Sequence, residues 1–337
     1  MSSNTIKCVV WDLDNTIWDG TLSEGDKVTL REGVFSVIKT LDERGILQSI
    51  SSKNEFEVAA KKLKELGLWA YFIYPQINWD SKSVALEKIA KSINININTF
   101  AFVDDQEFER EEVNFSHPEV MCIDAKDIRK IPKMERMIPK YITDDSKNRR
   151  IMYQNDIERN KLESSFEGTK EEFLATLNLR MKIELGQEVD LQRMEELTVR
   201  THQLNSTGTT YSYNELKDMI YSNNYIVLVA SLNDKFGIYG KIGLSVIEKK
   251  ENLWEIKLLL MSCRVMSKGV GNVMLNHIVN LARGKNVKLY AEFVPTDSNR
   301  IMYITYKLNG FKECGQEGIL EADTSYERKM PYYVCLN

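Results

Sequence analysis

The sequence predicts two domains of different fold class: an α/β domain with a doubly wound parallel sheet at residues 1–125 and an α+β domain at residues 179–337. Three observations support this division. The chain has 337 residues, more than one hydrophobic core usually spans. Residues 1–125 alternate strand and helix patterns, whereas consecutive β-rich segments follow residue 179. Residues 126–178 are charged and mostly helical in pattern, which predicts a connector.

Apolar strands and amphipathic helices alternate in the first domain. The helices carry apolar residues at spacings of three and four, and Asn54 is expected to cap the second of them. The predicted strands are residues 6–14, 46–52, 99–105 and 120–125, and the predicted helices are residues 33–45, 55–68 and 82–95. Strands joined by helices form a parallel sheet because each crossover brings the chain back in the same direction.

Composition excludes several kinds of partner. The formal net charge of -4 argues against general affinity for nucleic acid or an anionic membrane. The longest apolar runs are too short to cross a bilayer, and the first ten residues lack the apolar core of a secretion signal. The five cysteines are widely spaced without a CxxC, so neither a disulfide framework nor a zinc site is expected. We therefore expect a cytoplasmic protein.

Acidic residues and a lysine follow the predicted strands in an order that suits phosphoryl transfer. Asp12 and Asp14 point to the same side of an extended chain because side chains alternate. Asp12 would attack phosphorus, Asp14 would act as general acid and base, and Ser52 and Lys82 would hold phosphate oxygens. The expected Mg²⁺ ligands are Asp12, Asp14, Asp104 and Asp105. The alternative is structural, with a turn at DLDNT and a surface corner at the Asp-Asp pair.

The intervals between these residues leave no room for an inserted cap domain. About 40 residues separate Asp12 from Ser52 and about 30 separate Ser52 from Lys82, which suits helix-sized crossovers. The order of the features resembles the haloacid dehalogenase-like phosphatase superfamily over about residues 5–125. The resemblance implies a phosphoaspartyl intermediate on Asp12 with Mg²⁺ as cofactor. We expect a capless site that is either open to a large substrate or covered by the second domain.

In the second domain, strands pair as a meander before one helix crosses over. The predicted strands are residues 179–186, 225–234, 239–250, 253–263 and 287–294, the predicted helices are residues 188–200 and 271–286, and the segment 299–311 follows. This pattern indicates a mixed α+β domain.

Cys263 stands at a strand end, before a turn with Gly269 and Gly271 that begins a helix. Such glycines expose amide donors that suit a pyrophosphate or the phosphate of a pantetheine arm, although ordinary helix capping also explains them. Arg264 and the helix N-terminus would stabilise a Cys263 thiolate that takes up and releases an acyl group. The alternative is a buried structural cysteine.

This turn and the downstream TDSNRIMYITYKLNGF resemble the acyl-CoA-dependent N-acetyltransferase fold over about residues 180–337. In that fold the loop usually carries Arg or Gln three residues before the first glycine. Met266 stands there in this sequence, and Arg264 is displaced by two residues. The departure argues against ordinary use of acetyl-CoA.

The two halves together resemble the FkbH-like family of the phosphatase superfamily. The resemblance rests on the segments DLDNTIWDG, SSKNE, FVDDQEFEREEV, RTHQLNSTG and SCRVMSKGVG, in that order. It implies loading of a glyceryl unit from 1,3-bisphosphoglycerate onto the phosphopantetheine of an acyl carrier protein. Asp12 and Asp14 match the phosphatase acids of the family, and Cys263 matches its acyl-bearing cysteine.

The segment RTHQLNSTG is a polar cluster that either caps the preceding helix or serves the acyl-transfer site. It could bind the glycerate hydroxyls or orient Cys263, with His202 as a base. The predicted substrate-binding residues are Thr16, Ser52, Lys53, Asn54, Lys82, Gln203, Asn205, Arg264, Gly269 and Gly271.

The leading hypothesis is therefore a glyceryl transferase and Mg²⁺-dependent phosphatase. One alternative is a phosphatase fused to an acyl-CoA-dependent N-acyltransferase that acts on a small metabolite; the presence of Cys263 and of Met266 argues against it. Another alternative is a non-catalytic scaffold that docks carrier proteins; the intact set of acids argues against that.

Overall fold

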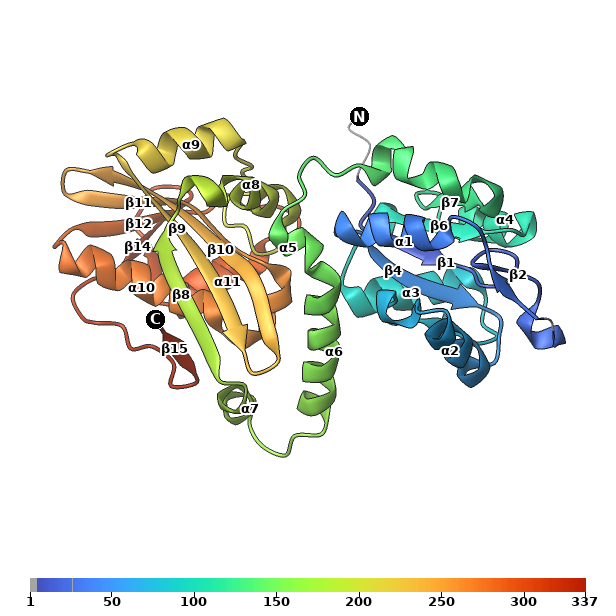
Figure 1. Ribbon diagram of the computed structural model, residues 1–337. Coiled ribbons are helices and arrows are strands. Elements are labelled where there is room, and N and C mark those ends of the chain that lie inside the picture. The colour runs from blue at the N-terminus through green and yellow to red at the C-terminus, as the bar shows by residue number, and fades with distance from the viewer. Residues whose placement is uncertain (1–4, 26) are drawn as a thin grey trace. The chain divides into compact units, whose positions relative to one another are not determined.

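The computed structural model describes residues 5–25 and 27–337, and the chain divides into two compact units, Met1–Glu158 and Arg159–Asn337 (Figure 1). The division falls inside the segment predicted as a connector. No helix within the described ranges combines the length and apolar composition needed to cross a membrane.

The first unit contains a five-stranded parallel sheet in the order β5-β4-β1-β6-β7. The chain winds outward from β1 to both sides, which confirms the predicted doubly wound sheet. Its strands are β1 (Cys8–Trp11), β4 (Leu47–Ser52), β5 (Gln76–Ile77), β6 (Phe100–Asp104) and β7 (Met121–Asp124). The two-residue β5 was not predicted.

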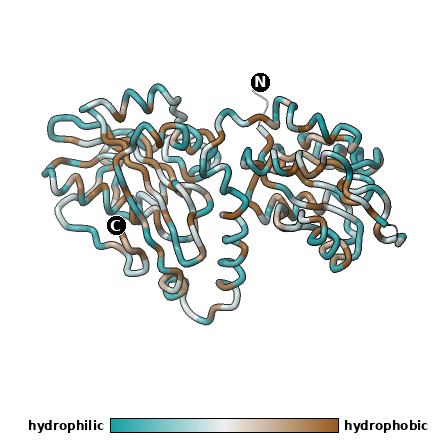
Figure 2. The backbone as a smooth tube through the Cα atoms, viewed as in Figure 1, coloured by the Kyte–Doolittle hydropathy of each residue, from teal (hydrophilic) through white to brown (hydrophobic). Residues whose placement is uncertain are grey.

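Helices cover both faces of this sheet. Val9 and Trp11 of β1 pack with one pair of helices, α1 (Val34–Glu43) and α2 (Phe56–Glu65). Cys8 and Val10 pack with the other pair, α3 (Lys82–Ile93) and α4 (Glu107–Ser116). Burial on both faces explains why β1 and β6 are almost wholly apolar and do not alternate, whereas β4 buries polar residues toward the site edge. Figure 2 shows this concentration of hydrophobic residues in the strands.

A small hairpin, β2 (Trp18–Asp19) with β3 (Thr29–Leu30), lies between β1 and α1 and was not predicted. Together with α1 it takes up the interval before β4, and the described residues there form no cap domain. One local prediction is wrong. The N-cap of α2 is Glu55, while the Asn54 side chain turns inward and donates a hydrogen bond to Asp14.

The segment after β7 is mostly helical, as its pattern predicts. Its elements are η4 (Ala125–Lys133), η5 (Glu135–Met137), α5 (Asp144–Lys147), α6 (Arg149–Ser164) and α7 (Lys170–Thr176). The division between the two units falls within α6.

The second unit contains an eight-stranded sheet in the order β13-β14-β12-β11-β10-β9-β8-β15. The strands are β8 (Leu179–Leu185), β9 (Tyr225–Asp234), β10 (Gly237–Lys250), β11 (Leu253–Met261), β12 (Lys288–Glu292), β13 (Phe311–Glu313), β14 (Ile319–Ala322) and β15 (Val334–Leu336). Most neighbours are antiparallel, whereas β11 with β12 and β8 with β15 are parallel. The edge strand β15 was not predicted.

Helices also cover both faces of the second sheet. One face packs on α8 (Leu191–Arg200) and α9 (Tyr213–Tyr221), and the other packs on α10 (Val270–Gly284) and α11 (Arg300–Leu308). The crossover from β11 to β12 runs through α10, as parallel pairing requires. The predicted meander followed by a crossover helix is confirmed.

Candidate functional site

The carboxyl edge of the first sheet brings together residues that are far apart in the sequence. Asp12 follows β1, Ser52 ends β4 and Asp104 ends β6. The amide of Asp12 donates to the carbonyl of Val103 at 2.9 Å, which fixes the loop after β1 beside the end of β6. Parallel strands place these residues on a common edge, so the sheet itself creates the cluster.

Lys82 lies at the centre of this cluster. Its ammonium forms an ion pair with Asp12, lies 3.4 Å from Asp104 Oδ2 and donates to the carbonyl of Ser51 at 2.6 Å. Its side chain is only 3% exposed. Burial by itself would lower the pKa of Lys82, but the carboxylates of Asp12 and Asp104 outweigh it and raise the pKa. Lys82 is therefore a fixed positive charge beside Asp12.

Three carboxylates form a group that suits a divalent cation. Asp12, Asp104 and Asp105 each offer an oxygen within 4.8 Å of the others. Among the described residues, Asp104 Oδ2 and Asp105 Oδ1 are buried oxygens without a hydrogen-bond partner. Buried acceptors normally have partners, so two such oxygens in one group fit a cation held by oxygen ligands, as Mg²⁺ prefers.

The pKa values of these carboxyl groups are raised, which fits a site that holds a cation. Burial raises the pKa of Asp104 to about 7, and the nearby charge of Asp12 adds to the shift. Burial also raises the pKa values of Asp12 and Asp105. Crowded carboxylates that resist ionisation gain most from a bound cation.

The Asp14 carboxylate is not part of this three-carboxylate group, and its role as a metal ligand stays a prediction. Its oxygens accept hydrogen bonds from Trp18 Nε1 at 2.7 Å, the Leu22 amide at 3.0 Å and Asn54 Nδ2 at 2.9 Å. These donors come from the hairpin and from the end of β4. They orient the carboxylate beside Asp12, which suits the predicted acid–base role.

The remaining residues predicted for the first site also lie at this edge. Thr16 is fully buried, and its hydroxyl accepts from the amide of Asp105 at 3.1 Å. The Ser52 hydroxyl accepts from Asn54 Nδ2 at 3.2 Å. Lys53 forms an ion pair with Glu109 of α4 at 2.7 Å. Sequence reasoning missed Glu109, because only the packing of α4 shows that this acid faces inward.

In the second unit, Cys263 follows β11 and begins the short helix η7 (Cys263–Lys268). It forms no disulfide. The guanidinium of Arg264 donates to the carbonyl of Tyr239 at 2.9 Å, which ties η7 to β10. The thiol thus stands at a strand end before a helix, as the sequence predicts.

The polar loop after α8 runs beside the end of β11. Asn205 bridges to Leu260 in antiparallel register, the amide of Met261 donates to Leu204 at 2.9 Å, and the amide of Ser206 donates to Leu259. His202 and Gln203 lie in the bend and turn that precede this bridge, and Cys263 lies beyond the end of β11 in η7. His202 and Gln203 are both exposed.

Asn205 and Ser206 organise this loop. Asn205 Oδ1 accepts from the amides of Thr207 and Gly208, and its Nδ2 donates to Thr209. The Ser206 hydroxyl accepts from the amide of Leu259 at 3.0 Å, and its carbonyl accepts from the amide of Val294 at 3.1 Å. The side-chain amide of Asn205 is therefore committed to its own loop.

The loop fills the space where two parallel strands diverge. Pairing of β11 with β12 ends at Ile256 and Ala291, although β11 continues to Met261. Beyond that point Ser206 forms hydrogen bonds with Leu259 of β11 and with Val294, which follows β12. Asn299 Nδ2 donates to the carbonyls of Asn205 and Val294. Sequence reasoning missed Ser206 and Asn299, since only the diverging strands give them a role.

The N-terminus of α10 carries the predicted glycines. Gly269 has φ +70°, and a Cβ there would clash with the hydroxyl of Tyr333. A Cβ at Gly271 would meet only Met261, at an ordinary contact distance. Tyr333 therefore covers part of this helix start, and Gly269 is needed for both its backbone conformation and the close approach.

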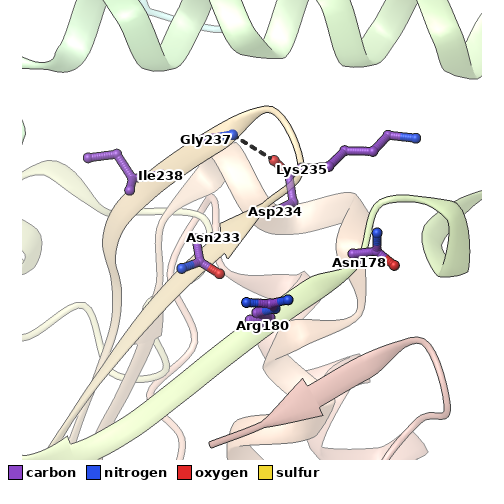
Figure 3. A pocket seen from close by; sticks show the side chains of 7 residues that line it. All are labelled: Asn178, Arg180, Asn233, Asp234, Lys235, Gly237 and Ile238. Carbon is purple, nitrogen blue, oxygen red and sulfur yellow. Dashed lines mark hydrogen bonds between the residues drawn. The ribbon is translucent and has the colours of Figure 1, made fainter.

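A separate pocket of about 350 Å³ lies at the turn between β9 and β10 (Figure 3). Its lining residues are Asn178, Arg180, Asn233, Asp234, Lys235, Gly237 and Ile238. None of the predicted site residues lines it.

Comparison with known proteins finds similarities to each half of the chain separately. No protein-family model matches the sequence. The chain is 29% identical over 136 residues to human magnesium-dependent phosphatase 1, a match that covers 35% of this chain and 76% of the human protein.

Solved structures similar to each half include three examples. The phosphatase domain of the protein BF1531 from Bacteroides fragilis, complexed with Mg, is 28% identical with a TM-score of 0.33; the match covers 37% of this chain and 38% of that one. The ribosomal-protein-S18-alanine N-acetyltransferase of Escherichia coli is 15% identical with a TM-score of 0.35, over 45% and 99% of the two chains. PaiA N-acetyltransferase from Thermoplasma acidophilum, in complex with coenzyme A, is 17% identical with a TM-score of 0.35, over 42% and 98%.

The predicted fold class is confirmed. A doubly wound parallel sheet, whose described residues include no inserted cap domain, is followed by an α+β domain with a mostly antiparallel sheet.

Proposed function

We propose that this protein is a Mg²⁺-dependent phosphatase joined to an acyltransferase that moves a glyceryl unit from 1,3-bisphosphoglycerate to an acyl carrier protein. The observation that carries the phosphatase half is the buried group of Asp12, Asp104 and Asp105 beside Lys82. The family resemblance and the position of Cys263 support the transfer half.

In the phosphatase step, a carboxylate oxygen of Asp12 attacks the phosphorus of the 3-phosphate ester. The bond from phosphorus to the ester oxygen breaks, and Asp14 protonates the departing alkoxide. Asp14 then takes a proton from a water molecule that hydrolyses the phosphoaspartate, which releases inorganic phosphate. Mg²⁺, held by Asp12, Asp104 and Asp105, supplies charge compensation when bound. Lys82 keeps a positive charge against the same oxygens.

In the transfer step, the thiolate of Cys263 attacks the acyl carbon of the acyl phosphate. A carbon–sulfur bond forms, the bond to the phosphate oxygen breaks, and phosphate leaves. The phosphopantetheine thiol of the carrier protein then attacks the thioester and releases Cys263. His202 accepts the proton of the attacking thiol in this proposal. The acyl phosphate is already activated, so neither ATP nor acyl-CoA is required.

A cytoplasmic location is part of the proposal. The cysteines Cys8, Cys122, Cys263, Cys314 and Cys335 form no disulfides, and a thiol nucleophile requires reducing conditions. The carrier protein, the three-carbon phosphate and Mg²⁺ are the proposed partners, and we propose no nucleic-acid or membrane partner.

The test is intact-protein mass spectrometry after incubation with 1,3-bisphosphoglycerate and Mg²⁺. The expected result is a glyceryl adduct that Cys263→Ala abolishes and that a carrier protein bearing phosphopantetheine removes. Cys335→Ala is a matched control, because Cys335 is an exposed cysteine of the edge strand β15, and it should keep the adduct. Absence of any adduct on the unmodified chain would refute the transfer half, and absence of Mg²⁺-dependent phosphate release would refute the phosphatase half.

The second candidate function is a phosphatase joined to an acyl-CoA-dependent N-acyltransferase. The order of the second sheet and the crossover between β11 and β12 favour it. Cys263 just after β11 and Met266 in η7 argue against it, because an N-acyltransferase needs no cysteine there and its loop usually carries Arg or Gln at the position of Met266. Calorimetry with acetyl-CoA separates the two functions: tight binding, and acyl transfer that survives Cys263→Ala, would favour the N-acyltransferase.

A further inference from the structure

Lys53 and Glu109 form an ion pair that the phosphatase chemistry does not use. Lys53 Nζ lies 2.7 Å from Glu109 Oε1, and the two side chains are 39% and 8% exposed. Lys53 follows the end of β4, and Glu109 lies in the first turns of α4, directly after Asp104 and Asp105. The pair therefore sits at the edge of the sheet that carries the site.

The Glu109 side chain is much more buried than the Lys53 side chain, so Lys53 is the partner that bends toward the other. A nearly buried carboxylate is costly unless a cation accompanies it. A lysine at a strand end would otherwise extend into water, where its four-carbon stem keeps its freedom. Glu109 thus draws the ammonium of Lys53 inward over the edge of the sheet, while part of Lys53 remains open to solvent.

The residues around Lys53 separate two sides of the site. The Asn54 side chain donates to Asp14 and to the hydroxyl of Ser52, so these two residues face the loop after β1. Lys53 points to the other side, toward α4. There Glu109 lies close enough to Lys82 for its charge to raise the pKa of that lysine. Lys82 is buried against the attacking carboxylate, and Lys53, whose side chain is partly exposed, pairs with Glu109 at the same edge of the sheet.

We propose that Lys53, positioned by Glu109, binds a second anionic group of the phosphate ester, namely the carboxylate or acyl phosphate at the far end of a short acid. Lys82 is fully occupied by Asp12, Asp104 and the Ser51 carbonyl, so it has little capacity for that second group. Lys53 pairs with Glu109, its side chain is partly exposed, and its ammonium has three donors. The preferred substrate class is therefore a phosphorylated acid, not a simple phosphorylated alcohol. This inference rests on the proposed phosphatase function.

The test compares two substrates that differ only in a carboxylate, 3-phosphoglycerate and glycerol 3-phosphate. The full-length protein with Mg²⁺ should favour 3-phosphoglycerate in kcat/KM by about 10- to 100-fold, because a charge-assisted hydrogen bond distinguishes them. Lys53→Met should reduce this ratio to about 1, mainly through the KM for 3-phosphoglycerate. Lys53→Arg should restore most of the ratio, and Glu109→Gln should give an intermediate value.

Lys88→Met is the matched control, since Lys88 also pairs with an acid, Asp80, but both side chains are about half exposed on the surface. It should keep the wild-type ratio. The inference is overturned if Lys53→Met keeps the ratio, or if it lowers kcat/KM for both substrates equally. Hydrolysis of p-nitrophenyl phosphate separates the two proposals: its absence in the unmodified protein overturns both, whereas its presence with an unchanged ratio overturns only the role of Lys53.

Discussion

At the scale of the residue, Lys82 offsets the electrostatic repulsion between the carboxylates of the site. It brings one positive charge to the buried carboxylates of Asp12 and Asp104. Because its side chain is 3% exposed, water contributes little to stabilising these charges. Removing one member of a buried charge network leaves the others without compensation. Stability and catalysis therefore depend on the same side chain.

Lys82→Met should lower the free energy of unfolding of the metal-free protein by about 3–5 kcal/mol, because two carboxylates lose their cation. Phosphatase kcat/KM should fall by about 10²–10³-fold through the loss of one charge on the transferring phosphoryl group. Urea unfolding and phosphate release measure the two effects. Lys39→Met removes an exposed lysine of α1 and should change neither; an equally stable and active Lys82→Met protein would contradict the assigned role.

Mg²⁺ should stabilise the protein more at pH 8 than at pH 5.5. The folded-state pKa of Asp104 is about 7, above its ordinary value of 3.8, so the metal-free folded chain binds an extra proton between these values. The stability from that proton is complete below about pH 4 and is lost as pH rises through about 7. A bound cation replaces the proton. Thermal unfolding with and without Mg²⁺ across this range is the measurement, and a Mg²⁺-induced shift independent of pH would contradict it.

At the scale of the element, the loop after α8 completes the second sheet where β11 and β12 part. Parallel strands that diverge leave backbone groups without partners, and buried backbone groups require them. Ser206 and Asn299 supply those partners from the loop and from the start of α11. The same loop carries His202 toward the end of β11, so a structural element and a predicted catalytic residue share one segment.

Asn205→Ala should destabilise the second unit by about 2 kcal/mol, because the amides of Thr207 and Gly208 and the carbonyl of Thr209 lose their partner. It should also slow formation of the Cys263 adduct, since the loop no longer holds its register. Denaturant unfolding and time-resolved mass spectrometry measure these effects. Gln203→Ala, at an exposed position of the same loop, should stay within about 0.5 kcal/mol of the parent.

At the scale of the whole molecule, the chain divides within α6, and Arg159 is the first residue of the second unit. Its guanidinium makes two bonds to Asp234, of 2.7 and 2.8 Å, and stacks on Tyr239 with 3.9 Å between the carbon and the ring centroid. The side chains of Arg159 and Asp234 are 1% and 0% exposed. The end of α6 is thereby fixed to the hairpin of β9 and β10.

Arg159→Ala should lower the free energy of unfolding of the second unit by about 3–5 kcal/mol, because Asp234 would remain buried without its cation. Chemical unfolding followed by circular dichroism measures the loss. Arg180→Ala removes an exposed arginine from the neighbouring β8 and should have an effect within about 0.5 kcal/mol. A similar loss of unfolding free energy in both variants would show that the buried ion pair contributes no more to stability than an exposed arginine does.

Sequence patterning was sufficient where the signal was local. The apolar strands and amphipathic helices of the first unit are predictable because burial on both faces selects continuous apolar runs and helical spacing. Asp12, Ser52, Lys82 and Asp104 could be placed at one edge because strand ends in a parallel sheet share it. The short strands β2, β3, β5, β13, β14 and β15 were missed, since two to four residues carry no clear periodicity.

The sequence by itself determined two fold classes, a capless first domain and the acids of a phosphoryl-transfer site. Only the tertiary structure decided what each side chain does there. It separated Asp14 from the three-carboxylate group, turned Asn54 from a helix cap into a donor to Asp14, and brought Glu109 to Lys53. It also placed Ser206 between diverging strands. The physical reason is that these roles depend on which way a side chain faces across two elements, and long-range packing alone fixes that direction.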